Sequence, residues 1–177
     1  MGKRYRNPEP GLAFFVTTTA KDFMQICCNE ACYQVITEAI RLNLLTYSMK
    51  LLGYVLMPNH VHLVLLGDGE KISSFMRDFK RAAAVRLRQE WDRAFPELKH
   101  RFKSPRGGGY KIWMDRFYLV VVYSESVLKT KLKYMLLNPV RKELVQSMFE
   151  WPHSSAVNYA NPDRAILPIE FIHLDLE

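Results

Sequence analysis

The chain has 177 residues, of which 49% are hydrophobic and 24% are charged, which are ordinary values for one globular domain with an apolar core. No run of eighteen or more apolar residues occurs, so we expect no membrane span. The three cysteines match neither a disulfide framework nor a zinc spacing, which is typical of a reduced, cytoplasmic protein, and the net charge of +7 favours an acidic partner such as nucleic acid or an anionic membrane surface.

The first part of the chain predicts a strand, a helix and a β-hairpin. Residues 11–19 are rich in β-branched and aromatic side chains, as strands are, and residues 30–45 repeat apolar side chains at helical spacing. Two further apolar runs, over residues 51–57 and 60–66, flank the turn-forming pair Pro58-Asn59. We therefore expect these two runs to pair as a hairpin.

The second part predicts a long helix, a loop, a strand and another helix. Ser73-Ser74 are the expected cap of a helix that runs to about Arg93, and the proline- and glycine-containing stretch 95–111 is typical of a mobile basic loop. A strand over residues 117–123 precedes a helix over about 125–138, which we expect to end before Pro139.

This order of elements predicts a ferredoxin-like α+β sandwich, in which an antiparallel sheet carries helices on one face. The additional helix towards the C-terminus contains Tyr134. We expect a single domain over residues 1–177, with a core over about 11–145 and an irregular tail over about 146–177.

The positive charge is concentrated in one window, from Arg77 to Arg116. This window holds twelve Lys and Arg residues against five acidic residues, whereas the rest of the chain is neutral. A solvated helix followed by a basic loop is one interpretation of the window. We favour a phosphate-binding surface, because charge clustered in this way otherwise repels itself.

His60 and His62 are separated by one residue on a predicted strand, so their side chains point to the same face of the sheet. Two neutral imidazoles at that separation can share a metal ion, although such pairs are more often packing or surface residues. Val61 between them is expected to face the core. Tyr134 lies beside the buried stripe of its helix, where a tyrosine is usually a half-buried packing residue.

The combination of motifs changes this interpretation. Gly53 to Leu63 (GYVLMPNHVHL), Trp113 to Phe117 (WMDRF), Tyr134 to Val140 (YMLLNPV) and Trp151 to Ser155 (WPHSS) follow one another in the chain. This series resembles the single-tyrosine HUH transposases, in particular the REP-associated tyrosine transposases and their insertion-sequence relatives. The resemblance covers residues 11–160, and its His-hydrophobic-His and Tyr-x3-Asn-Pro-Val segments are specific.

The resemblance implies that Tyr134 attacks a DNA phosphodiester and becomes joined to the 5′ phosphate, which frees a 3′ hydroxyl. It also implies that His60, His62 and Asn138 bind a divalent ion, Mg²⁺ or Mn²⁺. A phenol is a weak nucleophile at neutral pH, and a divalent ion that withdraws charge from the phosphate would assist its attack. Lys131 and Lys133 are candidates for neutralising the charge that develops.

The implied partner is single-stranded DNA with a hairpin, cut at sites that flank the hairpin. The candidate phosphate-binding residues are Arg77, Lys80, Arg81, Arg86, Arg88, Lys103, Arg106, Lys111 and Lys131. Tyr110 and Trp113 either stack on bases or pack beneath the basic loop. The protein is expected to work as a monomer or as a homodimer.

Two departures from the family pattern bear on the details. Family members commonly have a glycine just after the Asn-Pro-Val segment, where this chain has Arg141 to Val145 (RKELV), and the loop with Gly107 to Gly109 is long and basic. The main hypothesis is an active DNA strand transferase. The alternatives are a catalytically silent DNA-binding protein that retains the fold and a metal-dependent phosphoesterase that uses water, in which Tyr134 is structural.

Overall fold

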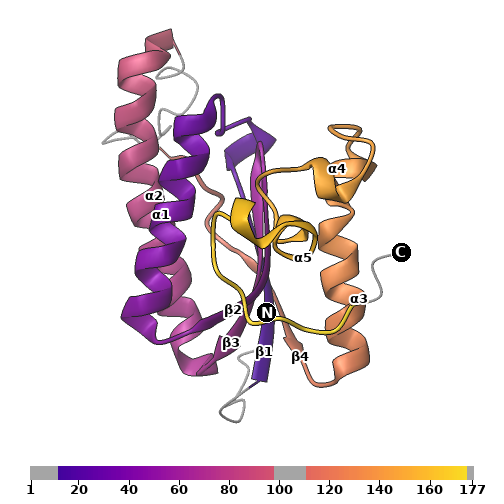
Figure 1. Cartoon of the computed structure of the whole chain (residues 1–177). Coiled ribbons are helices and arrows are strands. Elements are labelled where there is room, and N and C mark those ends of the chain that lie inside the picture. The colour runs from indigo at the N-terminus through magenta and orange to yellow at the C-terminus, as the bar shows by residue number, and fades with distance from the viewer. Residues whose placement is uncertain (1–11, 98–110, 175–177) are drawn as a thin grey trace.

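The computed structural model describes residues 12–97 and 111–174. Within them, four strands form one antiparallel sheet in the order β2-β3-β1-β4 (Figure 1). The strands are β1 (Leu12–Thr19), β2 (Lys50–Met57), β3 (His60–Gly67) and β4 (Tyr118–Val122). Each was predicted from its sequence to within a residue or two, including the β2–β3 hairpin.

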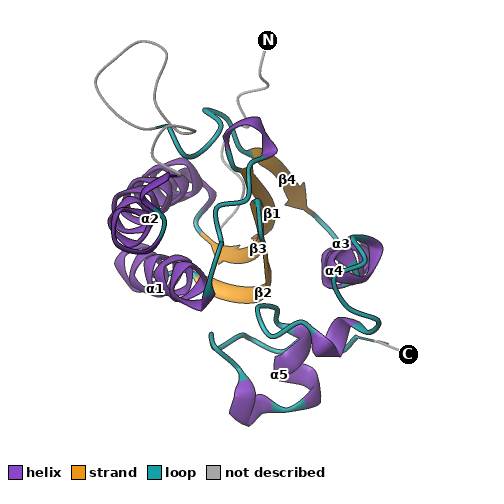
Figure 2. Ribbon diagram, turned by 90° about the horizontal axis from the view of Figure 1, so that it is seen from above, coloured by secondary structure: helices purple, strands orange, loops and turns teal. Residues whose placement is uncertain are grey.

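Two long helices cover one face of this sheet, and a third covers the other (Figures 1 and 2). The pair is α1 (Glu30–Tyr47) and α2 (Ile72–Ala94), and the third is α3 (Glu125–Leu136), followed by the short α4 (Asn138–Arg141). This is the predicted ferredoxin-like sandwich, and the additional helix that carries Tyr134 lies against the opposite face from α1 and α2.

Two details of the helices correct the sequence predictions. Ser73 and Ser74 do not cap α2, because the helix begins at Ile72, and Asp68 instead caps the preceding 3-10 turn η2 (Gly69–Lys71). Pro139 does not end the helical path either. It lies in the first turn of α4, where its missing N–H costs nothing, and only Leu137, whose backbone is also in the right-handed helical region, separates α3 from α4.

The sheet separates two apolar clusters. The cluster towards α1 and α2 contains aromatic side chains such as Phe14, Phe75 and Phe79, whereas the cluster towards α3 is smaller. On the α3 side, a Cβ built on Gly53 would lie 2.5 Å from Leu132 and 2.6 Å from Met135. The glycine in β2 therefore lets α3 approach the sheet closely.

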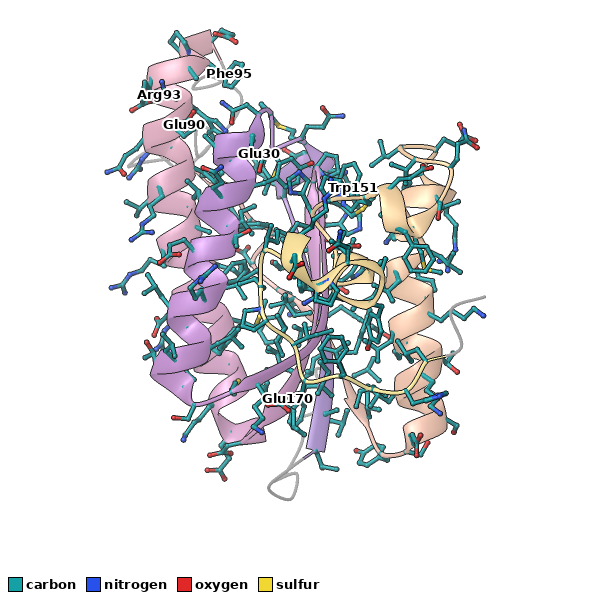
Figure 3. The ribbon with its side chains drawn as sticks, viewed as in Figure 1. Glu30, Glu90, Arg93, Phe95, Trp151 and Glu170 are labelled. Atoms are coloured by element: carbon teal, nitrogen blue, oxygen red, sulfur yellow. The ribbon has the colours of Figure 1, made fainter. Side chains whose placement is uncertain are left out.

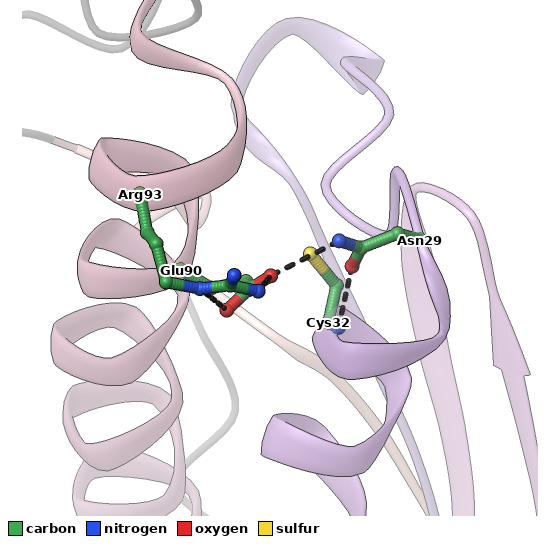
Figure 4. Close-up of polar contacts among 4 residues, drawn as sticks. All are labelled: Asn29, Cys32, Glu90 and Arg93. Carbon is green, nitrogen blue, oxygen red and sulfur yellow. Dashed lines mark hydrogen bonds and ion pairs between the residues drawn. The ribbon is translucent and has the colours of Figure 1, made fainter.

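A polar link ties the N-terminus of α1 to α2 (Figure 4). The Asn29 side chain accepts a hydrogen bond from the Cys32 N–H and donates one to Glu90, whose carboxylate also pairs with Arg93. Asn29 thus caps α1 and fixes its position along α2.

The segment after residue 146 lies along the free edge of β2 and contains η4 (Met148–Glu150), α5 (Ala156–Ala160) and η5 (Pro162–Arg164). The Trp151 indole N–H donates to the Leu56 carbonyl, and the Ser155 N–H donates to that of Tyr54. Further along, Glu170, which is labelled in Figure 3, forms an ion pair with Lys50. The segment therefore covers a strand edge that would otherwise expose unpaired backbone groups.

Candidate metal and nucleophile site

His60 and His62 lie at the start of β3, and their register places them opposite Thr19 and Thr17 of β1. Both rings lie on the α3 side of the sheet, where the His62 ring stacks on Phe15 and lies 4.7 Å from the His60 ring, centroid to centroid. Val61 between them is buried in the cluster towards α1 and α2, as predicted.

Asn138 brings a third polar side chain to the two histidines. Its amide Nδ2 lies 2.8 Å from His62 Nε2 and 3.3 Å from His60 Nε2. Asn138 is the first residue of α4 and follows Tyr134 of α3 by four residues, the spacing of neighbours on one face of a helix. Three side chains from two distant parts of the chain therefore converge at one point.

Burial sets the protonation of the imidazoles. It lowers the pKa of His60 to about 4, with a smaller contribution from the positive charge of Lys142. It lowers the pKa of His62 to about 3, with a further contribution from His60. Both rings are therefore neutral at pH 7, which is the form that binds metal ions.

The other nitrogen of each ring also has a partner. The Nδ1 atom of His60 lies 2.7 Å from Oδ1 of Asn59, and the Nδ1 atom of His62 lies 2.7 Å from Oγ1 of Thr17. Sequence reasoning did not identify either contact as part of the site. The position of Asn59, directly before His60 in the turn, was the one available signal, since the partner of His62 depends on strand register.

Tyr134 lies on α3 with its side chain at the edge of this cluster. Its ring centroid is 6.5 Å from that of His62, and the residue is 49% exposed, so the phenol is accessible from outside. The guanidinium carbon of Arg141 lies 4.4 Å from the centroid of the tyrosine ring, within the range of a cation–π contact. The structure thus brings together all four residues that the sequence singled out, and it adds Arg141.

The predicted phosphate-binding residues have several different environments. Lys80 is partly buried, and its ammonium donates to the carbonyls of Met114 and Asp115, so it holds the segment before β4. Arg77 pairs with Asp78, and Lys111 pairs with Asp115. These three basic residues were predicted to contact DNA phosphates, and each already has a partner within the protein.

The remaining basic candidates divide into four groups. Arg81 and Arg86 are exposed and line a groove between α1 and α2, together with Arg77. Arg88 is partly exposed on α2, whereas the Lys131 ammonium lies 5.5 Å from the centroid of the Phe15 ring, near the histidines. Lys103 and Arg106 lie outside the described residues.

Trp113 was one of two aromatic residues predicted either to stack on bases or to pack. It is 5% exposed and packs on Phe79, with ring centroids 6.0 Å apart. Its environment is that of a core residue, which excludes base stacking in this conformation. Tyr110 lies outside the described residues.

In the part of the chain that the structure describes, no group of three or more His, Cys, Asp or Glu side chains is arranged to hold a metal ion. The cluster around His60 and His62 has only two such side chains, and its third is the amide of Asn138. The described helices also include none that is long and apolar enough to cross a membrane.

Comparisons with known proteins agree with this fold. A family model described as "Transposase IS200 like" matches residues 14–136. A solved structure described as "Structure of the REP associates tyrosine transposase bound to a REP hairpin" has a TM-score of 0.70 and 20% sequence identity, over 100% of this chain and 94% of that chain. Another, described as a transposase from Deinococcus radiodurans R1, has a TM-score of 0.48 and 24% identity, over 76% and 93%. A search of curated proteins found no significant match.

Proposed function

Because the chain belongs to the family of IS200-like transposases, we propose that it is a metal-dependent endonuclease and strand transferase for single-stranded DNA. The reaction proceeds through a covalent 5′-phosphotyrosine on Tyr134. The observation that carries this proposal is the position of an exposed phenol beside a buried and a half-buried imidazole, both neutral, and an amide that converge on one point.

In the proposed reaction, the Tyr134 oxygen attacks the phosphorus atom of a phosphodiester. The new bond joins the phenol oxygen to phosphorus, the bond to the 3′ oxygen breaks, and that oxygen leaves and takes up a proton. The phenol proton passes to solvent. Because the intermediate keeps a phosphodiester bond, a 3′ hydroxyl can reverse the step at another site without a nucleotide cofactor.

The donor set fits a divalent cation. Both histidines are neutral, both Nε2 atoms face the amide of Asn138, and the Nδ1 atoms are occupied by partners that orient the rings. We therefore propose His60, His62 and Asn138 as the ligands. When bound, Mg²⁺ or Mn²⁺ would withdraw charge from the scissile phosphate. A set of two nitrogens and one amide leaves coordination positions for phosphate and water oxygens.

The protein's own cations would act on the substrate around this point. Arg141 lies over the tyrosine ring and Lys131 lies over Phe15, so both are near the proposed phosphate position. Arg81 and Arg86 lie on the α2 surface and suit contacts to the DNA backbone farther away. The solved structure with a TM-score of 0.70 is described as bound to a REP hairpin. We propose that this chain also cuts single-stranded DNA at sites that flank a hairpin.

A denaturing gel tests this proposal. Labelled single-stranded DNA that carries a hairpin and its flanks is incubated with the wild type, Tyr134→Phe and His62→Ala, with Mn²⁺ or with a chelator. We expect a metal-dependent protein–DNA adduct only with the wild type. Tyr123→Phe is the matched control, because Tyr123 is an exposed tyrosine directly before the other end of α3, and this variant should form the adduct.

Two other results would change the assignment. Metal-dependent release of free ends without an adduct would indicate a phosphoesterase that uses water. Tight DNA binding with no cleavage of any hairpin substrate would indicate a DNA-binding protein that retains the fold without turnover.

A further inference from the structure

The hydrogen bonds around His60 and His62 form a chain that starts at a backbone carbonyl. The Phe23 carbonyl oxygen lies 3.0 Å from Nδ2 of Asn59. A carbonyl can only accept a hydrogen bond, so the Asn59 amide must direct its NH₂ group to Phe23 and its oxygen to His60. The orientation of this amide is therefore determined by its surroundings.

This orientation fixes the tautomer of His60. The Asn59 oxygen lies 2.7 Å from His60 Nδ1, and an amide oxygen can only accept, so Nδ1 carries the hydrogen. In a neutral imidazole the other nitrogen, Nε2, then carries a lone pair. That lone pair faces the amide nitrogen of Asn138, which donates to it at 3.3 Å.

The same logic extends to His62. The Asn138 NH₂ group has two hydrogens, and its nitrogen also lies 2.8 Å from His62 Nε2, which must accept the second. His62 therefore carries its hydrogen on Nδ1 and donates it to the Thr17 hydroxyl at 2.7 Å. One backbone carbonyl thus determines the hydrogen positions of three side chains and two rings.

The segment that presents this carbonyl is strained. Asp22 and Phe23 both have positive φ angles, 53° and 55°, in the turn η1 (Lys21–Phe23). For residues other than glycine, this conformation is unfavourable. Backbone hydrogen bonds from Ala20 to Asn59 and from Lys21 to Ile112 hold the turn against the β2–β3 connection and the segment before β4. Strain that is maintained beside a candidate site is consistent with a functional constraint.

We propose that Asn59, anchored by the Phe23 carbonyl, is a positioning residue that fixes the tautomer of His60, and that it thereby prepares both Nε2 lone pairs for a metal ion. The inference rests on the proposed function. Without this anchor only the longer contact from Asn138, at 3.3 Å, would favour this tautomer, and because that amide can turn over, we expect the other tautomer to be populated. Because an amide ligates through its oxygen, the Asn138 side chain must also turn over when metal binds.

Nuclear magnetic resonance of the metal-free protein tests this directly. Long-range ¹⁵N–¹H correlations at pH 7.5 report which ring nitrogen of each histidine carries the hydrogen. We expect Nδ1–H for His60 and His62 in the wild type. In Asn59→Ala we expect His60 to shift to Nε2–H, whereas Asn59→Asp, whose carboxylate still accepts from Nδ1, should keep the wild-type tautomer.

Calorimetric titration with Mn²⁺, without DNA, gives the second result. Loss of a side chain that orients a ligand lowers metal affinity by about 10- to 100-fold, and we expect this for Asn59→Ala, with recovery of most of the affinity in Asn59→Asp. Asn161→Ala is the matched control, because Asn161 is exposed and its side chain makes no capping hydrogen bond at η5. That variant should match the wild type in both measurements.

The outcomes separate this inference from the proposed reaction. Nε2–H on His60 in the wild type, or an unchanged tautomer in a folded Asn59→Ala protein, would overturn the inference, and so would unchanged Mn²⁺ affinity. Absence of the DNA adduct in the gel assay, with the expected tautomers intact, would refute the proposed reaction and leave the positioning role of Asn59 standing.

Discussion

The two faces of the sheet differ in how they are covered. On the face towards α1 and α2, large aromatic side chains such as Phe14, Phe75 and Phe79 are almost completely buried in one apolar cluster. The other face is covered by α3 and by parts of the C-terminal segment such as Met148 and Ala156, and its apolar cluster ends at His62 and Asn138, two buried polar residues. One face is therefore built as a core, and the other combines a core with a polar site.

This difference implies that stability and chemistry are separated by the sheet. Burying neutral imidazoles and an amide contributes less to stability than burying aromatic side chains, because each polar atom must first lose its water. On the site face, hydrogen bonds among these polar groups offset part of this cost. Substitutions on the α1 and α2 face should therefore lower stability more than activity, whereas substitutions at the site should lower activity more than stability.

The largest effect on stability is expected on the α1 and α2 face. Phe79→Ala removes a fully buried ring that packs on Trp113, and such truncations cost about 3–5 kcal/mol. Chemical denaturation should show this loss, whereas the fraction that remains folded should still form the DNA adduct. A small loss of stability, or a folded variant that cannot form the adduct, would contradict the separation of the two faces.

Acid should destabilise the site face. The folded-state pKa of His62 is about 3, below the value of about 6.5 in an unfolded chain, so between these values the unfolded state binds a proton that the folded state excludes. Stability is therefore complete above pH 6.5 and falls as the pH is lowered through this window.

The measurement is the free energy of unfolding at pH 7 and pH 5, in chelator. We expect the wild type to lose about 2 kcal/mol more than His62→Gln over this interval. His173→Gln, a change at an exposed histidine, is the control and should lose as much as the wild type. An equal loss in His62→Gln and the wild type would show that His62 does not titrate as its burial requires.

A smaller, stabilising effect is expected in the turn after α4. Glu143 has a φ of 57°, in the left-handed region, and the family commonly places a glycine just after the Asn-Pro-Val segment. Glu143→Gly should relieve this conformation and raise the free energy of unfolding by about 0.5–1 kcal/mol. Lys142→Gly, whose φ is −95°, should instead be destabilising.

The smallest effect on stability is expected at the proposed nucleophile. Tyr134 is half exposed, and Tyr134→Phe removes only its hydroxyl, so the free energy of unfolding should change by less than about 0.5 kcal/mol. A loss above 2 kcal/mol would mean that the hydroxyl is a structural group and would weaken the case for a nucleophile.

The sequence predicted the elements of this fold because their patterns are local. Alternation in β3 placed His60 and His62 on one face, and helical spacing placed Tyr134 beside a buried stripe. Helical spacing also placed Asn138 beside Tyr134, four residues later, whereas only the motifs that resemble the transposase family indicated a role as a metal ligand.

Features that depend on register and on loop conformation could not be predicted in this way. The contact of Thr17 with His62 follows from the pairing of β1 with β3, and the contact of Asn59 with Phe23 follows from two positive φ angles. Basic residues were predicted to bind DNA from their charge alone. Charge does not reveal that the Lys80 ammonium donates hydrogen bonds to two backbone carbonyls.

The most direct test of the central claim is to identify the residue that becomes joined to DNA. The wild-type adduct is trapped with Mn²⁺, digested with nuclease and trypsin, and sequenced by mass spectrometry. We predict that the nucleotide remnant is attached to Tyr134, in the peptide that runs from Tyr134 to Arg141. A remnant on Tyr118 or Tyr123 would contradict this assignment, and one on Tyr123, directly before the other end of α3, would move the reaction away from His60, His62 and Asn138.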